Sequence, residues 1–221
     1  MAYPTVSAPY GLKPVNLIGG QVYAGSTRLI PIASGYNTNI FYGDVVKLAN
    51  TGTIEKDTGT TTVATNGVAG IFVGCTYTNP STKQPTWAQY WPAGIAAADA
   101  QAYVVDDPDV LFKVAAVSSG TTVAFYAQTV VGNNVALVQN SGSTNTGDSA
   151  VAINGSTVAA TASLPIRIVA GVPDTANASG EFCEFICKFN APYPTITIDF
   201  TGETASVATA GGHMYNNASG V

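Results

Sequence analysis

The sequence predicts an all-β fold, either a β-barrel or a β-sandwich. From about residue 21 to residue 190, short segments rich in Val, Ile, Thr, Tyr and Phe follow one another, separated by Gly, Asn, Asp and Pro. This alternation of strand-forming and turn-forming residues is typical of antiparallel sheets. Only residues 93–102 have helical propensity, enough for roughly two or three turns. The helices that parallel strands need for their crossovers are therefore missing.

The strands can be placed in order along the chain. We predict them at residues 28–32, 40–48, 53–55, 68–77, 101–105, 110–117, 121–131, 164–169, 182–189 and 195–200. Residues 50–52 contain a glycine and should connect the second and third strands as a hairpin. Gly70 and Gly74 should let the fourth strand bend or approach another strand closely. Residues 195–200 alternate between apolar and polar side chains, as a half-exposed strand does.

The chain divides into three parts. Residues 1–20 have no helical or strand period but are too apolar for a solvated tail, so we predict an extended N-terminal arm that lies on a surface, its own or a neighbour's. A disordered terminus is the alternative. Residues 21–190 should form the β domain. Within it, residues 139–162 are rich in small polar side chains and should form an exposed excursion with a tight turn at Asn154-Gly155. Residues 191–221 should form a C-terminal strand and arm.

Charged residues are scarce, at 10% of the chain against a typical value of about 25%. A chain with so little charge is expected either to hide much of its surface against partners or to rely on Thr, Ser, Asn and Gln for hydration. The net charge of -5 and the scattered basic residues argue against nucleic-acid binding. No apolar run reaches the length of a membrane span, and the N-terminus does not resemble a signal peptide.

No arrangement of residues in the sequence is typical of a catalytic or cofactor site, so we expect a protein that is not an enzyme and has no cofactor. The single histidine, His213, lies in a Gly-rich segment without the serine elbow of a hydrolase. The three cysteines do not have zinc-site spacing. Cys183 and Cys187 would lie roughly 13 Å apart on one strand, whereas a disulfide needs at most about 7 Å. Buried free thiols are therefore expected.

Asp106, Asp107 and Asp109 form the only concentration of charge in the sequence. Carboxylates on such a turn could bind a hard cation such as Ca²⁺, but the ligand spacing of a dedicated calcium loop is absent. A solvated turn between two strands is the favoured interpretation.

Aromatic residues gather at residues 77–91, where Tyr77, Trp87, Tyr90 and Trp91 lie among prolines. They could form a stacking platform for sugars or peptides. The favoured interpretation is a structured loop that covers the core or packs at a subunit interface, where Trp and Tyr are enriched.

Several segments resemble small head proteins of tailed phages that infect cyanobacteria or marine bacteria. The resemblance is carried by Ala8-Pro9-Tyr10-Gly11-Leu12-Lys13-Pro14-Val15, by Tyr42-Gly43-Asp44-Val45-Val46-Lys47-Leu48, by residues 70–77 continuing to Gln89-Tyr90-Trp91-Pro92-Ala93-Gly94, by Tyr103-Val104-Val105-Asp106-Asp107-Pro108, and by residues 188–190 with Tyr215-Asn216-Asn217. It implies a β-tulip-like capsid cement or decoration protein, synthesised in the host cytoplasm and placed on the capsid exterior. It also implies a homotrimer that contacts the major capsid protein through extended termini.

The candidate interface residues follow from the resemblance together with the apolar arm and the aromatic cluster. They are Tyr3, Pro4, Tyr10, Leu12, Pro14, Trp87, Trp91 and Tyr215. Two alternatives stay open: a tail or head-fibre component, and a carbohydrate-binding β module that uses the loop containing Trp87 and Trp91. Neither nucleic acid nor membrane is an expected partner.

Overall fold

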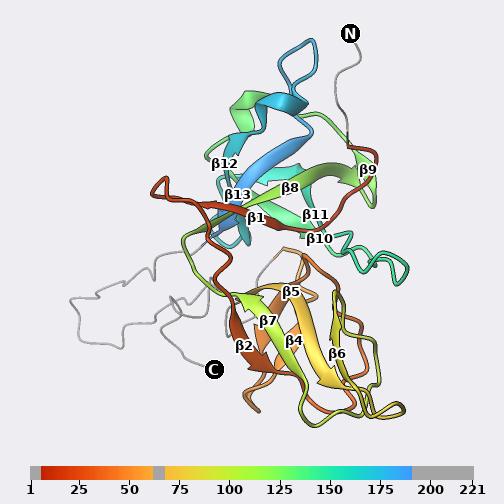
Figure 1. The fold of residues 1–221 in the computed structure, drawn as a ribbon. Coiled ribbons are helices and arrows are strands. Elements are labelled where there is room, and N and C mark those ends of the chain that lie inside the picture. The colour runs from red at the N-terminus through yellow and green to blue at the C-terminus, as the bar shows by residue number, and fades with distance from the viewer. Residues whose placement is uncertain (1–5, 62–67, 191–221) are drawn as a thin grey trace, which may run out of the picture.

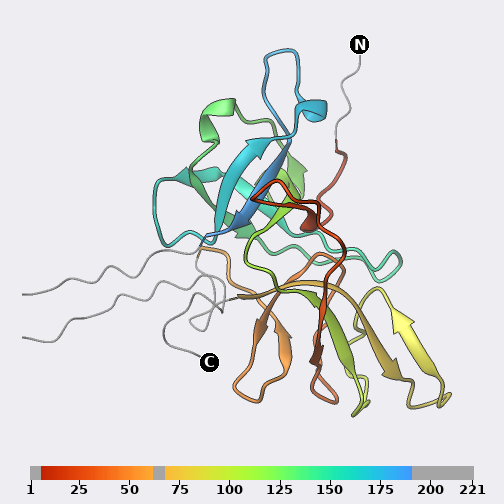
Figure 2. The same cartoon turned by 60° about the vertical axis from the view of Figure 1, so that its left-hand side comes forward.

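Nearly all regular structure in the chain is β-strand, which confirms the predicted all-β class (Figure 1). The computed structural model describes residues 6–61 and 68–190. Two short 3-10 helices, η1 (Gln128–Val130) and η2 (Pro173–Thr175), complete the regular elements of this part. No helix among these residues is long and apolar enough to span a membrane. The strands form two sheets, one above the other in Figures 1 and 2.

The first sheet closes into a five-stranded barrel, because its last strand pairs back with its first. The order around the barrel is β8, β11, β10, β12 and β13, and β1 and β9 attach to β8 outside the ring. The strands are β1 (Lys13–Leu17), β8 (Val110–Ser119), β9 (Thr122–Val123), β10 (Asn134–Val138), β11 (Ala152–Ala159), β12 (Ile166–Gly171) and β13 (Glu184–Phe189).

The second sheet has the order β2-β7-β5-β3-β4, with β6 paired to β5. Its strands are β2 (Arg28–Pro31), β3 (Val45–Leu48), β4 (Ile54–Lys56), β5 (Val68–Thr78), β6 (Pro85–Ala88) and β7 (Gln101–Val105). The predicted hairpin is confirmed, since β3 and β4 pair antiparallel. A parallel bridge between Ile32 and Ile54 brings the end of β2 to β4.

Each sheet has its own core, and the two cores meet. The core of the second sheet is centred on Phe72 and Trp91. The barrel core is centred on Phe112 and Phe185, but it also contains side chains that β3, β5 and β7 present from the second sheet: Val45, Ile71 and Val105. The second sheet therefore uses both of its faces at the end that touches the barrel.

The prediction of an extended arm over residues 1–20 is wrong for its second half. β1 pairs antiparallel with β8, with Pro14 opposite Phe112 and Leu17 opposite Val110. Leu12 has no solvent exposure and packs in the barrel core. The apolar character that indicated an arm instead reflects burial within the domain. Residues 1–5 lie outside the described part of the chain.

The predicted helix at residues 93–102 is also wrong. These residues form turns and the start of β7. Ala97 and Ala100 are buried in the core of the second sheet, and the Ala100 carbonyl accepts a hydrogen bond from Ile32 N at 3.0 Å. Packing of these small side chains therefore outweighs the helical propensity of alanine.

The tight turn at Asn154-Gly155 and the exposed excursion around it are wrong over residues 152–159, which form β11. Asn154 pairs with Ala136 of β10 and with Val117 of β8. A side chain at Gly155 would overlap the ring of Tyr126, so the glycine makes room for an aromatic ring rather than for a turn.

The strand predicted at residues 121–131 is wrong for most of its length. Only Thr122–Val123 form a strand, β9, and Gln128–Val130 form the short helix η1. The strand predicted at 195–200 lies outside the described residues.

Gly70 lies at the closest approach between β5 and the end of β7. Its φ is 150°, and a Cβ built there would overlap the Val105 carbonyl oxygen, an atom of the rigid backbone. Close approach is therefore the role of this glycine, as the sequence suggested.

Replacing Gly70 by alanine should lower the free energy of unfolding by about 3 kcal/mol or more, because the strands must separate to admit the Cβ. Urea denaturation would measure the change. Gly19→Ala is the matched control, since no atom lies within 4 Å of a Cβ there, and it should change stability by less than about 0.5 kcal/mol. Equal stabilities for the two variants would contradict the prediction.

Candidate functional site

A buried carboxylate lies where the two sheets meet. Asp44 is fully buried and comes directly before β3. Its Oδ2 lies 2.9 Å from Lys56 Nζ on β4 and accepts a hydrogen bond from Phe41 N. Its Oδ1 accepts a hydrogen bond of 2.6 Å from Ser149 Oγ, in the segment that leads into β11 of the barrel. One side chain thus connects the second sheet to the first.

Backbone hydrogen bonds cross the same junction. Leu12 N donates to Gly43 O at 3.0 Å, Gly11 N donates to Val151 O at 3.1 Å, and Ser149 N donates to Tyr42 O at 3.0 Å. Gly11 has a φ of 81°, and a Cβ there would lie 2.7 Å from Ser149 Cβ. The N-terminal segment is therefore held between the two sheets and fixes their relative position.

Tyr10 anchors this segment on the barrel. Its hydroxyl donates a hydrogen bond to Glu184 Oε1, a buried carboxylate that also lies 3.3 Å from Lys113 Nζ. Lys13 and Lys113 place their ammonium groups 5.4 and 5.6 Å from the centre of the Tyr10 ring, within cation–π range. Burial, and then the hydrogen bond to Glu184, raise the pKa of Tyr10 above its ordinary value of 10.0.

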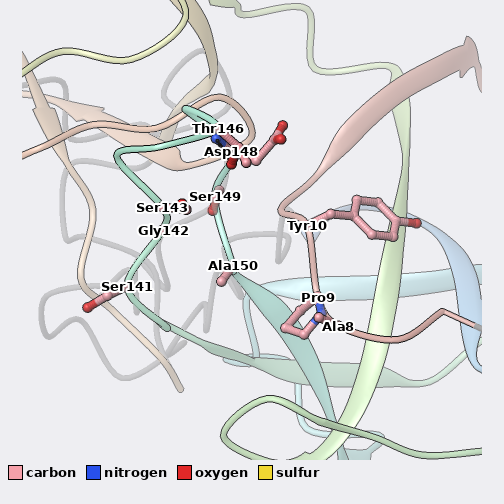
Figure 3. Close-up of a pocket in the computed structure, with 10 residues that line it drawn as sticks. All are labelled: Ala8, Pro9, Tyr10, Ser141, Gly142, Ser143, Thr146, Asp148, Ser149 and Ala150. Atoms are coloured by element: carbon pink, nitrogen blue, oxygen red, sulfur yellow. Dashed lines mark hydrogen bonds between the residues drawn. The ribbon is translucent and has the colours of Figure 1, made fainter.

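A shallow cavity of about 340 Å³ opens beside the anchored segment (Figure 3). Its walls are the N-terminal segment on one side and the loop before β11 on the other. They consist of Ala8, Pro9, Tyr10, Ser141, Gly142, Ser143, Thr146, Asp148, Ser149 and Ala150. The carboxylate of Asp148 accepts a hydrogen bond from Gln89 Nε2 and lies 3.7 Å from Lys13 Nζ, so its charge is already matched by the protein. The cavity offers small polar groups and no charge that awaits a ligand.

The acidic turn between β7 and β8 is held by basic residues of neighbouring strands. Asp106 forms an ion pair with Arg28 of β2, and Asp109 lies 3.8 Å from Lys188 of β13. Asp107 Oδ1 accepts a hydrogen bond from Asp109 N. Within residues 6–61 and 68–190, no group of three or more His, Cys, Asp or Glu side chains is placed to hold a metal ion. The turn contributes to joining the sheets.

The cysteines are free and buried, as predicted for Cys183 and Cys187. Burial raises the pKa of the Cys75 thiol to about 12 and also raises that of Cys187. A thiol with so high a pKa is a poor nucleophile. His213 lies outside the described residues.

The structure separates the residues predicted to form an interface. Tyr10 and Pro14 are half-buried, and Leu12 is in the core, so Leu12 presents no surface to a partner. Tyr3, Pro4 and Tyr215 lie outside the described residues. These residues therefore do not form one patch.

The two tryptophans face opposite sides of the second sheet. Trp91 is fully buried, and its Nε1 donates to Tyr36 O at 3.1 Å. Trp87 is on β6 and is 71% exposed. The two rings therefore do not form one exposed stacking platform in this structure. Trp87 remains as an exposed aromatic residue on an edge strand.

Three further exposed apolar side chains were not predicted: Ile18, Val22 and Leu29. For Leu29 a signal existed in the sequence, because alternation along a strand places Leu29 on the face opposite to Ile30. Ile18 and Val22 lie in a loop whose sequence has no period.

Replacing Asp44 by alanine should lower the free energy of unfolding by about 3 kcal/mol or more, because Lys56 would keep a nearly buried charge without its partner. Denaturation by urea, followed by tryptophan fluorescence, measures the change. Asp174→Ala, at an exposed position on the barrel, should stay within about 0.5 kcal/mol of the parent protein. A loss for Asp44→Ala no larger than that of the control would contradict the role of Asp44.

Stability should fall as the pH rises above about 10, because the unfolded chain then releases a Tyr10 proton that the folded chain retains. In Tyr10→Phe the free energy of unfolding should fall less steeply with pH than in the parent protein, by up to about 1 kcal/mol per pH unit. Tyr23 and Tyr77, whose pKa values are also raised by burial, should keep part of the slope. Urea denaturation of both proteins between pH 8 and pH 11 tests this, and identical slopes would count against it.

The chain was compared with family models, with curated proteins and with solved structures, and none of them matched it.

Proposed function

We propose that the protein is a non-enzymatic structural component of a virion, a capsid cement or decoration protein that binds across major capsid protein subunits. In this proposal it acts as a homotrimer on the capsid exterior. The proposal takes its partner from the resemblance of several segments to phage head proteins. The observation on which it rests most heavily is the exposed Trp87.

Trp87 projects from the outer face of the second sheet. Ala88, its neighbour on β6, packs against the core of that sheet, so the Trp87 side chain points the opposite way. Leu29 on β2 is 52% exposed and also points outward, because Ile30 is in the core. Large apolar side chains at the ends of one sheet face suit a protein interface, and tryptophan is the residue type most enriched at binding hot spots.

The rigid junction between the sheets supports a clamping role. A clamp between capsid subunits must resist being pulled apart, and here Asp44, Lys56 and Ser149 bind the sheets through a buried network. Contacts that exist only in the assembled shell stabilise it by mass action. Several copies of one attachment site on an oligomer add avidity, so each contact can be modest.

The scarcity of charge fits the same role. With only 10% charged residues, the surface has a low cost of desolvation when it is covered by a partner.

Mass spectrometry of purified virions tests the proposal directly. The protein should be present at a copy number comparable to that of the major capsid protein. Absence from virions would overturn the proposal. A presence of only a few copies would replace it with a tail or head-fibre role.

Trp87→Ala should weaken attachment to capsids by roughly thirtyfold, as expected for a hot-spot tryptophan. Binding of the purified variant to capsids stripped of the protein would measure the loss. Ser179→Ala, at an exposed position on the barrel, should bind like the parent. Unchanged binding of Trp87→Ala would show that the outer face of the second sheet is not the attachment surface.

A further inference from the structure

β6 is an edge strand of the second sheet, and its outer side is open. Among the described residues it pairs with β5 alone, and no isolated bridge or further backbone hydrogen bond involves residues 85–88. Figure 2 shows it as the yellow arrow at the right-hand edge of the sheet. Folded proteins guard exposed edges with charged side chains, bulges or prolines. The short strand β6 has no charge and no bulge, and its proline, Pro85, guards only the first position.

Trp87 presents its backbone groups to this open side. In an antiparallel ladder, the backbone groups of successive residues point alternately toward the neighbouring strand and away from it. Asn79 N donates to Gln84 O at 2.9 Å, so the Gln84 carbonyl points toward β5. Two-residue steps along the regular register give Thr86 and Ala88 the same direction. The N–H and C=O of Trp87 therefore point outward.

Trp87 thus combines outward backbone groups with a side chain that is 71% exposed. An extended polypeptide matches both features. Its own N–H and C=O groups recur at the strand spacing and can pair with those of Trp87, while one of its side chains packs on the indole ring. The geometry of this edge therefore favours a peptide segment as its ligand.

Lys83 indicates the charge that such a segment should carry. It is the only charged residue in the range 78–98, and it is exposed on the turn that leads into β6. Within residues 6–61 and 68–190, Lys83 forms no ion pair. An acidic side chain on the bound segment would match its charge and speed association. The β6 strand of a second copy has no acidic residue to offer, so a foreign segment fits this edge better.

We infer that β6 receives an extended segment of the major capsid protein as an added strand. Its backbone pairs with Trp87, an uncharged side chain packs on the Trp87 ring, and an acidic side chain lies beside Lys83. This assignment rests on the proposed function, which supplies the capsid protein as the partner.

Hydrogen exchange of the full-length protein, free and bound to capsids stripped of it, tests the added strand. The Trp87 amide should exchange at least about tenfold more slowly on the capsid, because it gains a hydrogen-bond acceptor there. The amides of Thr86 and Ala88 already face β5 and should change less, so they are internal controls. An unchanged exchange rate of the Trp87 amide in the bound protein would overturn the inference.

A pair of variants separates the backbone contact from the ring. Trp87→Ala removes the ring, whereas Trp87→Pro also removes the outward N–H, which has no partner within the described chain. Trp87→Pro should therefore bind stripped capsids about tenfold more weakly than Trp87→Ala. Urea denaturation checks that both variants are folded. Equal binding of the two would count against an added strand and would leave the capsid proposal intact.

Lys83→Gln should slow association with the stripped capsids at low salt and have little effect at high salt, where charges are screened. No change at either salt concentration would show that no acidic residue faces Lys83. If the Trp87 amide of the isolated protein becomes protected as dimers form in sedimentation, a second copy occupies the edge and the inference is wrong. Failure of the parent protein to bind capsids at all would overturn both this inference and the proposed function.

Discussion

The buried carboxylate of Asp44 is the interaction on which the arrangement of the two sheets depends. It receives the Lys56 ammonium group from its own sheet and the Ser149 hydroxyl from the barrel side, away from competing water. A charge in such a place is tolerated only when its partners are all in position. Correct docking of the sheets is therefore coupled to the hydrogen bonds and ion pair of one side chain, Asp44. The backbone hydrogen bonds of Gly11, Leu12 and Gly43 lie at the same junction.

The N-terminal segment provides a second attachment between the barrel and the second sheet. Tyr10 rests against the barrel through Glu184, while Lys13 lies between the rings of Tyr10 and Tyr42. Tyr42 belongs to the second sheet's side of the junction, next to Gly43 and Asp44. One short stretch of chain thus contacts both sheets.

Sequence patterning was enough for the fold class and for most strands, because alternation of apolar and polar residues directly reflects a sheet with one buried face. It failed where a tertiary contact decides the local structure. Gly155 resembles a turn residue but makes room for Tyr126, and Ala97 and Ala100 resemble helix formers but fill a core. At the candidate surface, the aromatic composition of the sequence could suggest Trp87. Only the structure shows that Trp87 is exposed whereas Trp91 is buried.

Closure of the barrel also governs how the chain reaches this structure. The ring is completed by β13 on β8, strands separated by more than sixty residues, and β1 must find the same strand from the other direction along the chain. Contacts between such distant segments require most of the chain entropy to be lost before they stabilise anything, so folding should be slow compared with that of a helical protein of this size. Until β13 arrives, the edge of β8 is an unpaired template for other chains. High protein concentration during folding is therefore the condition under which misassembly would compete with the native ring.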